Sequence, residues 1–232
     1  LSAAGPAAKG ATLFCTLEPC CHTGRTGPCV EQIVVSGIRR VVVAVEDPNP
    51  LVARGGISFL RDQGVQVEVG LCGREAFQVN RDFFTFIRYN RPFVTMKIAL
   101  SKDRCTTSKE GSRAIITSTT ANRHAHLLRA EVDAIGVGSG TIVTDDPLLT
   151  AREVYRRRPL TRVIFDTRLR TPPTARIFST LDHGPVIIVT TTKVVNSRAG
   201  DVEILVKAGA KIECLESRKI KMALVRMGEL GI

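Results

Sequence analysis

Short apolar runs alternate with helix-like segments along the first ninety residues, and this alternation constrains the fold more than any other feature. We predict strands at residues 11–17, 39–45 and 65–69, and helices at residues 28–36, 55–63 and 75–87. A strand–helix repeat of this kind favours a layered α/β sheet in which neighbouring strands run parallel.

The pattern breaks at Tyr89-Asn90-Arg91-Pro92, because proline stops a helix and disfavours helix in the residue before it. We therefore expect one domain at residues 1–90 and a second at residues 93–232. In the second domain we predict strands at residues 93–100, 134–137, 160–165, 186–189 and 202–205, and helices at residues 119–129 and 219–227.

Composition places the 232-residue chain among ordinary globular proteins, with 44% hydrophobic and 24% charged residues. The sequence has no run of eighteen apolar residues, so we expect no membrane-spanning segment. Seven cysteines at irregular positions do not suggest a disulfide framework, which favours a reducing, cytoplasmic setting.

The formal net charge of +11 indicates either a solvated basic surface or an anionic partner. Arginines crowd between Arg152 and Arg176, but only Tyr155 and Phe165 lie among them as aromatic residues. Modules that bind nucleic acid usually interleave aromatic side chains for base stacking. We therefore expect no specific nucleic acid, which leaves a solvated basic surface or a phosphorylated small molecule as partner.

Cys20 and Cys29 lie where a predicted strand end meets a predicted helix start, and Pro28 suits the first helical turn. A helix N-terminus lowers the pKa of a thiol, and zinc binds the thiolate form. The spacing thus predicts a metal site. Two alternatives remain: buried cysteines near a turn, or a structural zinc site that also uses Cys15 and Cys21.

Two motif sets resemble one bifunctional enzyme family. The segment T-L-E-P-C-x-H-x-G-R-T-x-P-C, ending at Cys29, resembles the zinc-site segment of the riboflavin-pathway pyrimidine deaminases, which are cytidine-deaminase-like. The stretch R-A-E-x-D-A-I-x-V-G-x-G-T-x-x-x-D-D-P-x-L-T-x-R, from Arg129 to Arg152, resembles the reductase half of the same enzyme. The resemblance implies a cytidine-deaminase-like layered α/β domain followed by a dihydrofolate-reductase-like α/β domain.

The resemblance also implies roles for individual residues. Cys20 and Cys29 correspond to two zinc ligands, while the family's third ligand and its catalytic glutamate come from a His-x-Glu motif that none of the four histidines here begins. We expect that motif upstream of Leu1. The implied substrate-binding residues are Arg25, Asp47, Asn49, Lys97, Arg129, Leu149 and Arg152. The implied cofactor-binding residues are Leu100, Ile115, Thr141, Asp145 and Thr167.

The implied chemistry has two steps in riboflavin biosynthesis. A zinc-bound hydroxide deaminates 2,5-diamino-6-ribosylamino-4(3H)-pyrimidinone 5′-phosphate, and NADPH then reduces the ribosyl group to a ribityl chain. The resemblance further implies a homodimer formed through the reductase domain. The alternative is a non-catalytic remnant, or a basic binding protein with a structural zinc site.

Three of the departures from the family fall in the second domain. Arg104 replaces a turn glycine, which predicts a positive φ at a residue with a side chain, and Ile115 replaces a tryptophan. The sequence also stops before the family's E-G-G-x-x-L segment, so we expect weakened cofactor binding and low activity from these 232 residues alone.

Overall fold

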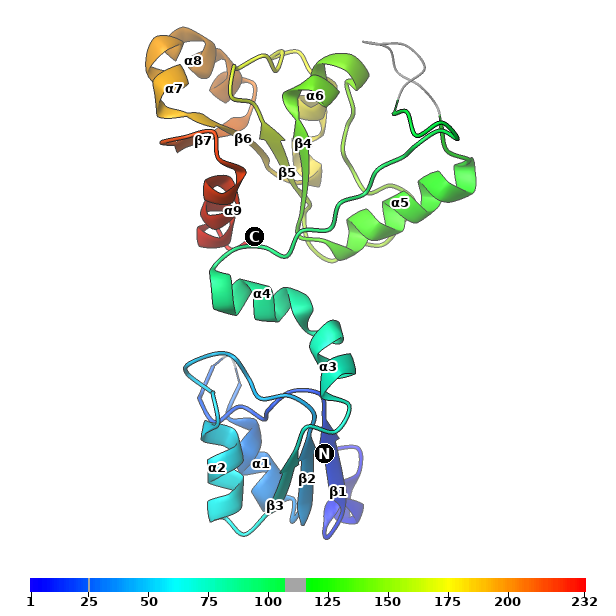
Figure 1. Ribbon diagram of the computed structural model, residues 1–232, viewed down its shortest axis with the longest axis vertical. Helices are drawn as coiled ribbons and strands as arrows, with labels where there is room; N and C mark the ends of the chain where they lie inside the picture. The colour runs from blue at the N-terminus through cyan, green and yellow to red at the C-terminus, as the bar shows by residue number, and fades with distance from the viewer. Residues whose placement is uncertain (25, 107–115) are drawn as a thin grey trace. The chain divides into compact units, whose positions relative to one another are not determined.

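The computed structural model describes residues 1–24, 26–106 and 116–232 (Figure 1). Contacts between Cα atoms divide the chain into two compact units, Leu1–Phe93 and Val94–Ile232. Each unit has its own parallel sheet and its own hydrophobic core. We describe the two units separately.

The first unit is built on a three-stranded parallel sheet in the order β1-β2-β3. Its strands are β1 (Thr12–Cys15), β2 (Arg40–Val43) and β3 (Gln66–Val69), and its first helices are η1 (Gly5–Ala8), α1 (Cys29–Val35) and α2 (Gly55–Asp62). Every predicted strand and helix up to residue 69 is confirmed, with slightly shorter bounds. The middle strand is buried along Val41–Val43, as expected for β-branched residues covered on both faces.

The helix predicted at residues 75–87 is wrong as a single element. The structure has two helices there, α3 (Gly73–Val79) and α4 (Arg81–Tyr89). Asn80 lies between them with φ −103° and ψ 14°, and its Nδ2 donates to the carbonyl of Ala76 at 2.8 Å. An asparagine side chain that bonds the preceding turn competes with continued helix, which explains the break.

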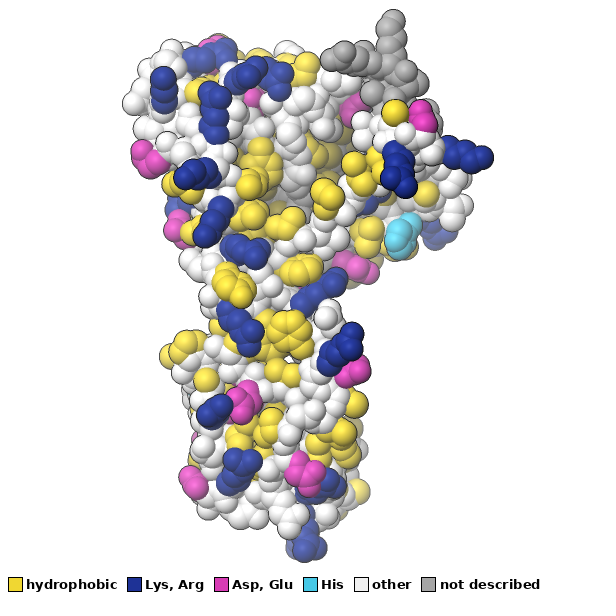
Figure 2. Space-filling view, in the orientation of Figure 1, with side chains coloured by type: hydrophobic (Ala, Val, Ile, Leu, Met, Phe, Trp, Pro, Cys, Tyr) yellow, Lys and Arg dark blue, Asp and Glu magenta, His cyan; other side chains and the backbone are white. Residues whose placement is uncertain are grey.

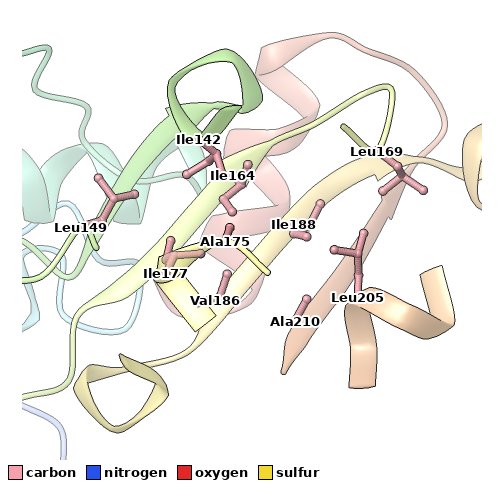
Figure 3. Packing of buried hydrophobic residues seen from close by; sticks show 10 residues of the cluster. All are labelled: Ile142, Leu149, Ile164, Leu169, Ala175, Ile177, Val186, Ile188, Leu205 and Ala210. Atoms are coloured by element: carbon pink, nitrogen blue, oxygen red, sulfur yellow. The ribbon is translucent and has the colours of Figure 1, made fainter. Parts of the chain in front are cut away.

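The second unit is built on a four-stranded parallel sheet in the order β4-β5-β6-β7. The strands are β4 (Ala134–Gly138), β5 (Thr161–Phe165), β6 (Val186–Thr191) and β7 (Ala210–Leu215). Figure 3 shows the larger core, in which Ile164 and Ile188 from the central strands pack with Ile142, Ile177 and other buried residues. A second cluster joins Val163, Ile187 and Val189 to Ala223 and Met227 of the last helix.

Helices connect and cover these strands. They are α5 (Thr119–Glu131), α6 (Ser139–Asp145), η2 (Arg176–His183), α7 (Thr192–Ser197), α8 (Ala199–Lys207) and α9 (Ile220–Glu229). Ser118 caps α5 by accepting a hydrogen bond from the Ala121 amide at 3.2 Å. The predictions for α5, β4, β5, β6 and α9 are confirmed, whereas α6 and β7 were not predicted.

Two predicted strands of the second unit are wrong. Residues 93–100 form no strand: they pair with no strand of the described chain, and Met96 and Ile98 are exposed. Residues 202–205 belong to α8, where Val202 and Leu205 pack one turn apart against the core. A four-residue apolar run is too short to distinguish the strand period from the helix period.

The structure contains no candidate membrane span in residues 1–24, 26–106 and 116–232, because none of the helices there is both long and apolar enough to cross a bilayer.

Candidate functional sites

The two thiols of the first unit lie together. The loop after β1 carries Cys20, α1 begins at Cys29, and the Cys29 amide donates to Cys20 Sγ at 3.4 Å. The predicted lowering of the thiol pKa is wrong for Cys29, whose pKa is raised. The side-chain hydrogen bond with Cys20 is the main cause, burial and the Cys20 charge add to it, and a backbone hydrogen bond with Cys20 acts in the opposite direction.

Zinc needs more ligands than the described part of the chain supplies. Its residues contain no group of three or more His, Cys, Asp or Glu side chains that could hold a metal ion. Cys21 instead packs against the core of the first unit, so the four-thiol alternative is not formed there. Cytidine-deaminase-like zinc enzymes, the class expected from the sequence, use three protein ligands to the metal. The thiol pair alone does not fit that requirement, and no deamination step follows from it.

Glu18 organises the loops around the thiol pair, although the sequence motif did not reveal its role. Its carboxylate is buried and accepts backbone hydrogen bonds from Asp47 (3.2 Å), Arg54 (3.1 Å) and Ile57 (3.1 Å). The residue therefore ties the loop after β1 to the loop after β2 and to the start of α2. The one available signal was a glutamate placed directly after a predicted apolar strand.

The Asp47-Pro48-Asn49-Pro50 loop follows β2, so it lies at the same sheet edge as the thiol loop. Asp47 is buried and its Oδ1 accepts from the Asn49 amide at 2.8 Å, while Asn49 Oδ1 accepts from the Leu51 amide at 3.1 Å. Burial raises the pKa of Asp47, the Asn49 amide lowers it, and the Glu18 charge raises it further. Arg25, the other predicted substrate contact of this unit, lies outside the described residues.

A close backbone approach holds α2 against the thiol loop. A Cβ atom added at Gly56 would lie 1.9 Å from the carbonyl oxygen of Pro19, the residue before Cys20. No side chain fits at that distance. The glycine therefore permits α2 to begin directly behind the loop that carries Cys20.

In the second unit, Arg129 and Arg152 come from different segments and meet beside His126. The Arg152 amide donates to His126 Nδ1 at 3.1 Å, Arg152 Nη2 lies 3.3 Å from His126 Nε2, and Arg129 Nη1 donates to the Thr150 carbonyl at 3.2 Å. The pKa of Arg129 is lowered, first by burial and then by the Arg152 charge. Neither arginine forms an ion pair with a carboxylate of the described chain.

This cluster lies within a generally basic surface. Figure 2 shows Lys and Arg side chains spread over the visible face of each unit, with fewer acidic side chains among them. Two unpaired guanidinium groups held near each other repel, and an anion placed between them relieves that repulsion. The arrangement is therefore suited to bind a phosphate. His126 was not predicted, although its position one turn before Arg129 on α5 was a usable signal.

A buried arginine positions the loop between α6 and Arg152. Arg162 is fully buried in β5 and its Nη1 donates to the carbonyls of Leu148 (3.4 Å) and Ile177 (3.1 Å), while Nη2 donates to the Thr180 carbonyl (2.8 Å). Leu149 follows with φ 54°, and its side chain is buried in the core. Leu149 could therefore contact a ligand only through its backbone. A charged residue inside an apolar strand was the signal for Arg162.

Three predicted cofactor contacts lie at the carboxyl ends of β4 and β5. Thr141 and Asp145 belong to α6, directly after β4, and Thr167 follows β5. Arg170 Nη2 donates to Ser139 Oγ at 3.1 Å and so links the two loops. Asp146, rather than Asp145, makes a loop contact, because its Oδ1 accepts from the Arg176 amide at 2.8 Å. Ligands of parallel α/β sheets bind at this edge.

Thr167 also lines a small pocket of about 70 Å³ between the ends of β5, β6 and β7 and the start of α9. Thr190 lines it too, and its buried Oγ1 has no hydrogen-bond partner among the described residues. Arg218 and Lys219 complete its rim. An unpaired hydroxyl and two cations fit a polar, anionic group of a nucleotide such as NADPH, although the volume holds only part of one.

The remaining residues predicted to bind substrate or cofactor in the second unit do not lie at the carboxyl edge of its sheet. Lys97 and Leu100 lie in the extended segment that joins no sheet, and both are exposed. Ile115 lies outside the described residues. At Arg104 the prediction of a positive φ is confirmed, with φ 64°.

The fold and the site define an α/β protein with a cluster of basic residues beside a parallel sheet. Residues 92–229 match the family described as RibD C-terminal domain. The riboflavin biosynthesis protein RibD of Aquifex aeolicus is 43% identical over 232 residues, covering 100% of this chain and 64% of that protein. RibD of Bacillus amyloliquefaciens is 41% identical, covering 100% of this chain and 62% of that protein.

Solved structures also show similarity to RibD proteins. Acinetobacter baumannii RibD superposes with a TM-score of 0.80 at 31% identity, covering 98% of this chain and 62% of that one. A Thermotoga maritima diaminohydroxyphosphoribosylaminopyrimidine deaminase/5-amino-6-(5-phosphoribosylamino)uracil reductase gives a TM-score of 0.78 at 29% identity, covering 97% and 60%. The chain belongs to the RibD family. It spans less than two thirds of the length of these relatives.

Proposed function

We propose that the second unit is the reductase of riboflavin biosynthesis, acting on the ribosyl group of 5-amino-6-(5-phosphoribosylamino)uracil. One observation carries this proposal: Arg129 and Arg152 converge beside Thr150 without a carboxylate partner in the described chain. A guanidinium pair of this kind matches the 5′-phosphate that the proposed substrate carries.

In this proposal the chain's own residues mainly bind and orient. Arg129 and Arg152 hold the phosphate, and Arg162 fixes the loop from Leu148 onward so that Arg152 stays near α5. If bound, NADPH would supply a hydride to the sugar C1, while the bond from C1 to the ring oxygen breaks and that oxygen takes up a proton, leaving a ribityl chain. Thr141, Asp145 and Thr167 would contact that cofactor at the carboxyl edge of the sheet, with Thr190 and Lys219 near one of its polar groups.

We further propose that the first unit derives from a cytidine-deaminase-like domain acting on the preceding, diamino form of the substrate. The adjacent thiols of Cys20 and Cys29 and the Glu18-anchored Asp47–Asn49 loop support this proposal. The zinc that such a domain uses needs a ligand beyond this thiol pair. The seven free cysteines are consistent with the cytoplasm as the site of action.

The phosphate clamp is tested by titrating the chain with ribose 5-phosphate and with ribose, followed by calorimetry. Arg129→Leu and Arg152→Leu should each weaken ribose 5-phosphate binding at least about tenfold, because a charge-assisted bidentate contact is lost. Arg157→Leu, at an exposed arginine near the cluster, is the matched control and should change binding little. Equal affinity for ribose and ribose 5-phosphate would contradict the proposal.

The hydride step is tested separately by the absorbance of NADPH at 340 nm. The phosphorylated ribosylaminouracil should consume NADPH, and the same compound without its phosphate should not. Phosphate-independent consumption would show that the arginine pair is not the substrate clamp.

A further inference from the structure

The proton on His126 can be placed from its hydrogen bonds. The Arg152 backbone amide donates to Nδ1 at 3.1 Å, and a backbone N–H can only donate. Nδ1 must therefore carry a lone pair. In a neutral imidazole the other nitrogen then carries the hydrogen, so His126 presents Nε2–H.

That assignment leaves two donors facing each other. Nε2 of His126 lies 3.3 Å from Nη2 of Arg152, and a guanidinium has no acceptor. These two groups cannot satisfy each other. A single oxygen at about 2.8 Å from each nitrogen would accept from both, which is the usual length of a charge-assisted hydrogen bond.

The charges around the ring favour its neutral form. Burial lowers the pKa of His126, and the charges of Arg129 and Arg152 lower it further. The Thr150 carbonyl and Glu153 act in the opposite direction and are weaker. The ring is therefore a neutral donor near pH 7, beside two cations.

We propose that His126 is a third ligand of the substrate phosphate, donating from Nε2 to an oxygen shared with Arg152. This inference rests on the proposed function, because it takes the arginine pair to be the phosphate site. His126 adds a neutral Nε2–H donor to the two arginines. The hydrogen bond from the Arg152 backbone amide to Nδ1 sets the direction of this donor. His126 thus both binds the anion and orients the segment that carries its partner arginine.

The first test is the tautomer of His126 in the free protein. Long-range ¹H–¹⁵N spectra of the full 232-residue chain should show Nε2 protonated and Nδ1 unprotonated at pH 7.5. Addition of inorganic phosphate should shift the Nε2 signal and leave the His124 signals unchanged. A ring protonated at Nδ1, or a His126 signal indifferent to phosphate, would overturn the inference.

The second test is phosphate affinity by calorimetry. His126→Leu should weaken inorganic phosphate binding by about tenfold to a hundredfold, the range expected for one hydrogen bond to a charged group. His126→Gln should recover part of the affinity, since its amide offers both an acceptor and a donor. His124→Leu, on an exposed residue of the same helix, is the control.

The outcomes separate the two proposals. If Arg129→Leu and Arg152→Leu abolish binding while His126→Leu binds like the unaltered chain, the role of His126 is wrong and the arginine clamp stands. If none of the three substitutions changes phosphate affinity, the clamp itself is wrong. Circular dichroism of each variant shows whether α5 and its loop remain folded.

Discussion

At the scale of single residues, the site depends on side chains whose polar groups are directed by backbone atoms. Glu18 accepts three amides, Arg162 donates to four carbonyls, and His126 accepts the Arg152 amide. Buried polar groups are stable only when they are paired, so each of these residues restricts the loops around it. Among the described residues, Arg156 Nε, Arg162 Nε and Thr190 Oγ1 are exceptions, and Thr190 lines the pocket beside Thr167.

Arg104 offers a prediction at this scale. A residue with a side chain costs about 1–2 kcal/mol in the left-handed region, and glycine does not. Arg104 has φ 64° in an exposed turn, where its amide donates to the Ser101 carbonyl at 2.9 Å. Arg104→Gly should therefore raise the free energy of unfolding by about 0.5–1 kcal/mol, after the greater flexibility of the unfolded glycine is deducted. Urea denaturation of Arg104→Gly and of the unaltered chain measures this difference in unfolding free energy.

Arg104→Ala is the matched control, because it removes the same side chain and keeps the Cβ atom. It should give no gain in stability. Equal stability of the glycine and alanine variants would mean that the backbone conformation at this turn carries no measurable strain.

At the scale of elements, the loops after the strands form the sites, and hydrogen-bonded polar side chains connect those loops. In the first unit the connection is Glu18, which reaches the loop after β2 and the start of α2. In the second it is Arg170, which joins the loop after β5 to Ser139 at the start of α6. Asp166 adds rigidity there, since its Oδ2 accepts from the Thr171 amide at 2.7 Å and hydroxyl at 2.8 Å.

Replacing Glu18 tests the importance of such a connection. Glu18→Gln turns an amide N–H₂ toward backbone donors and should cost about 2 kcal/mol of unfolding free energy, the usual cost of leaving buried donors unpaired. Glu46→Gln removes the exposed carboxylate that pairs with Arg54 at 3.1 Å, and should cost less than about 1 kcal/mol. Urea denaturation of the two variants compares them. Similar losses would show that Glu18 is no more important than a surface ion pair.

At the scale of the whole molecule, each unit has a core of its own. Val41, Val43 and Leu60 belong to the core of the first, and Ile164, Ile177 and Ile188 to that of the second. Because a parallel sheet is buried on both faces, its central strand carries most of the apolar contacts. The stability of each unit should therefore depend mainly on its own central strands.

Hydrogen exchange with peptide-level mass spectrometry tests this independence. Ile188→Ala leaves a cavity in a fully buried strand and should cost about 2–5 kcal/mol. Exchange should accelerate in peptides from β4 to β7 and stay unchanged in those from β1 to β3. Val41→Ala, in the first unit, is the reciprocal variant: exchange should accelerate in peptides from β1 to β3 and stay unchanged in those from β4 to β7. Faster exchange in both units after either substitution would show that they unfold as one.

Much of the fold could be predicted from local patterns. The β-branched runs at residues 41–43 and 186–189 predicted buried strands, and the motif residues Cys20, Cys29, Arg129 and Arg152 were identified as candidates before any geometry. These features depend on periodicity and on residue chemistry, which the sequence states directly. The same patterns gave wrong strand predictions at residues 93–100 and 202–205. A run of apolar residues does not show which segment it pairs with or packs against.

The sequence by itself determined the α/β class and the parallel direction of neighbouring strands in the first unit, and it singled out Arg129 and Arg152 as candidate anion ligands. Only the tertiary structure decided that His126 lies against Arg152, twenty-six positions away, and that Glu18 binds an amide of α2 thirty-nine positions away. It also decided that Cys29 has a raised pKa and that residues 93–100 pair with no strand in residues 1–24, 26–106 and 116–232. Local propensity acts over one or two turns of chain, whereas hydrogen bonding and burial depend on groups brought together from distant segments.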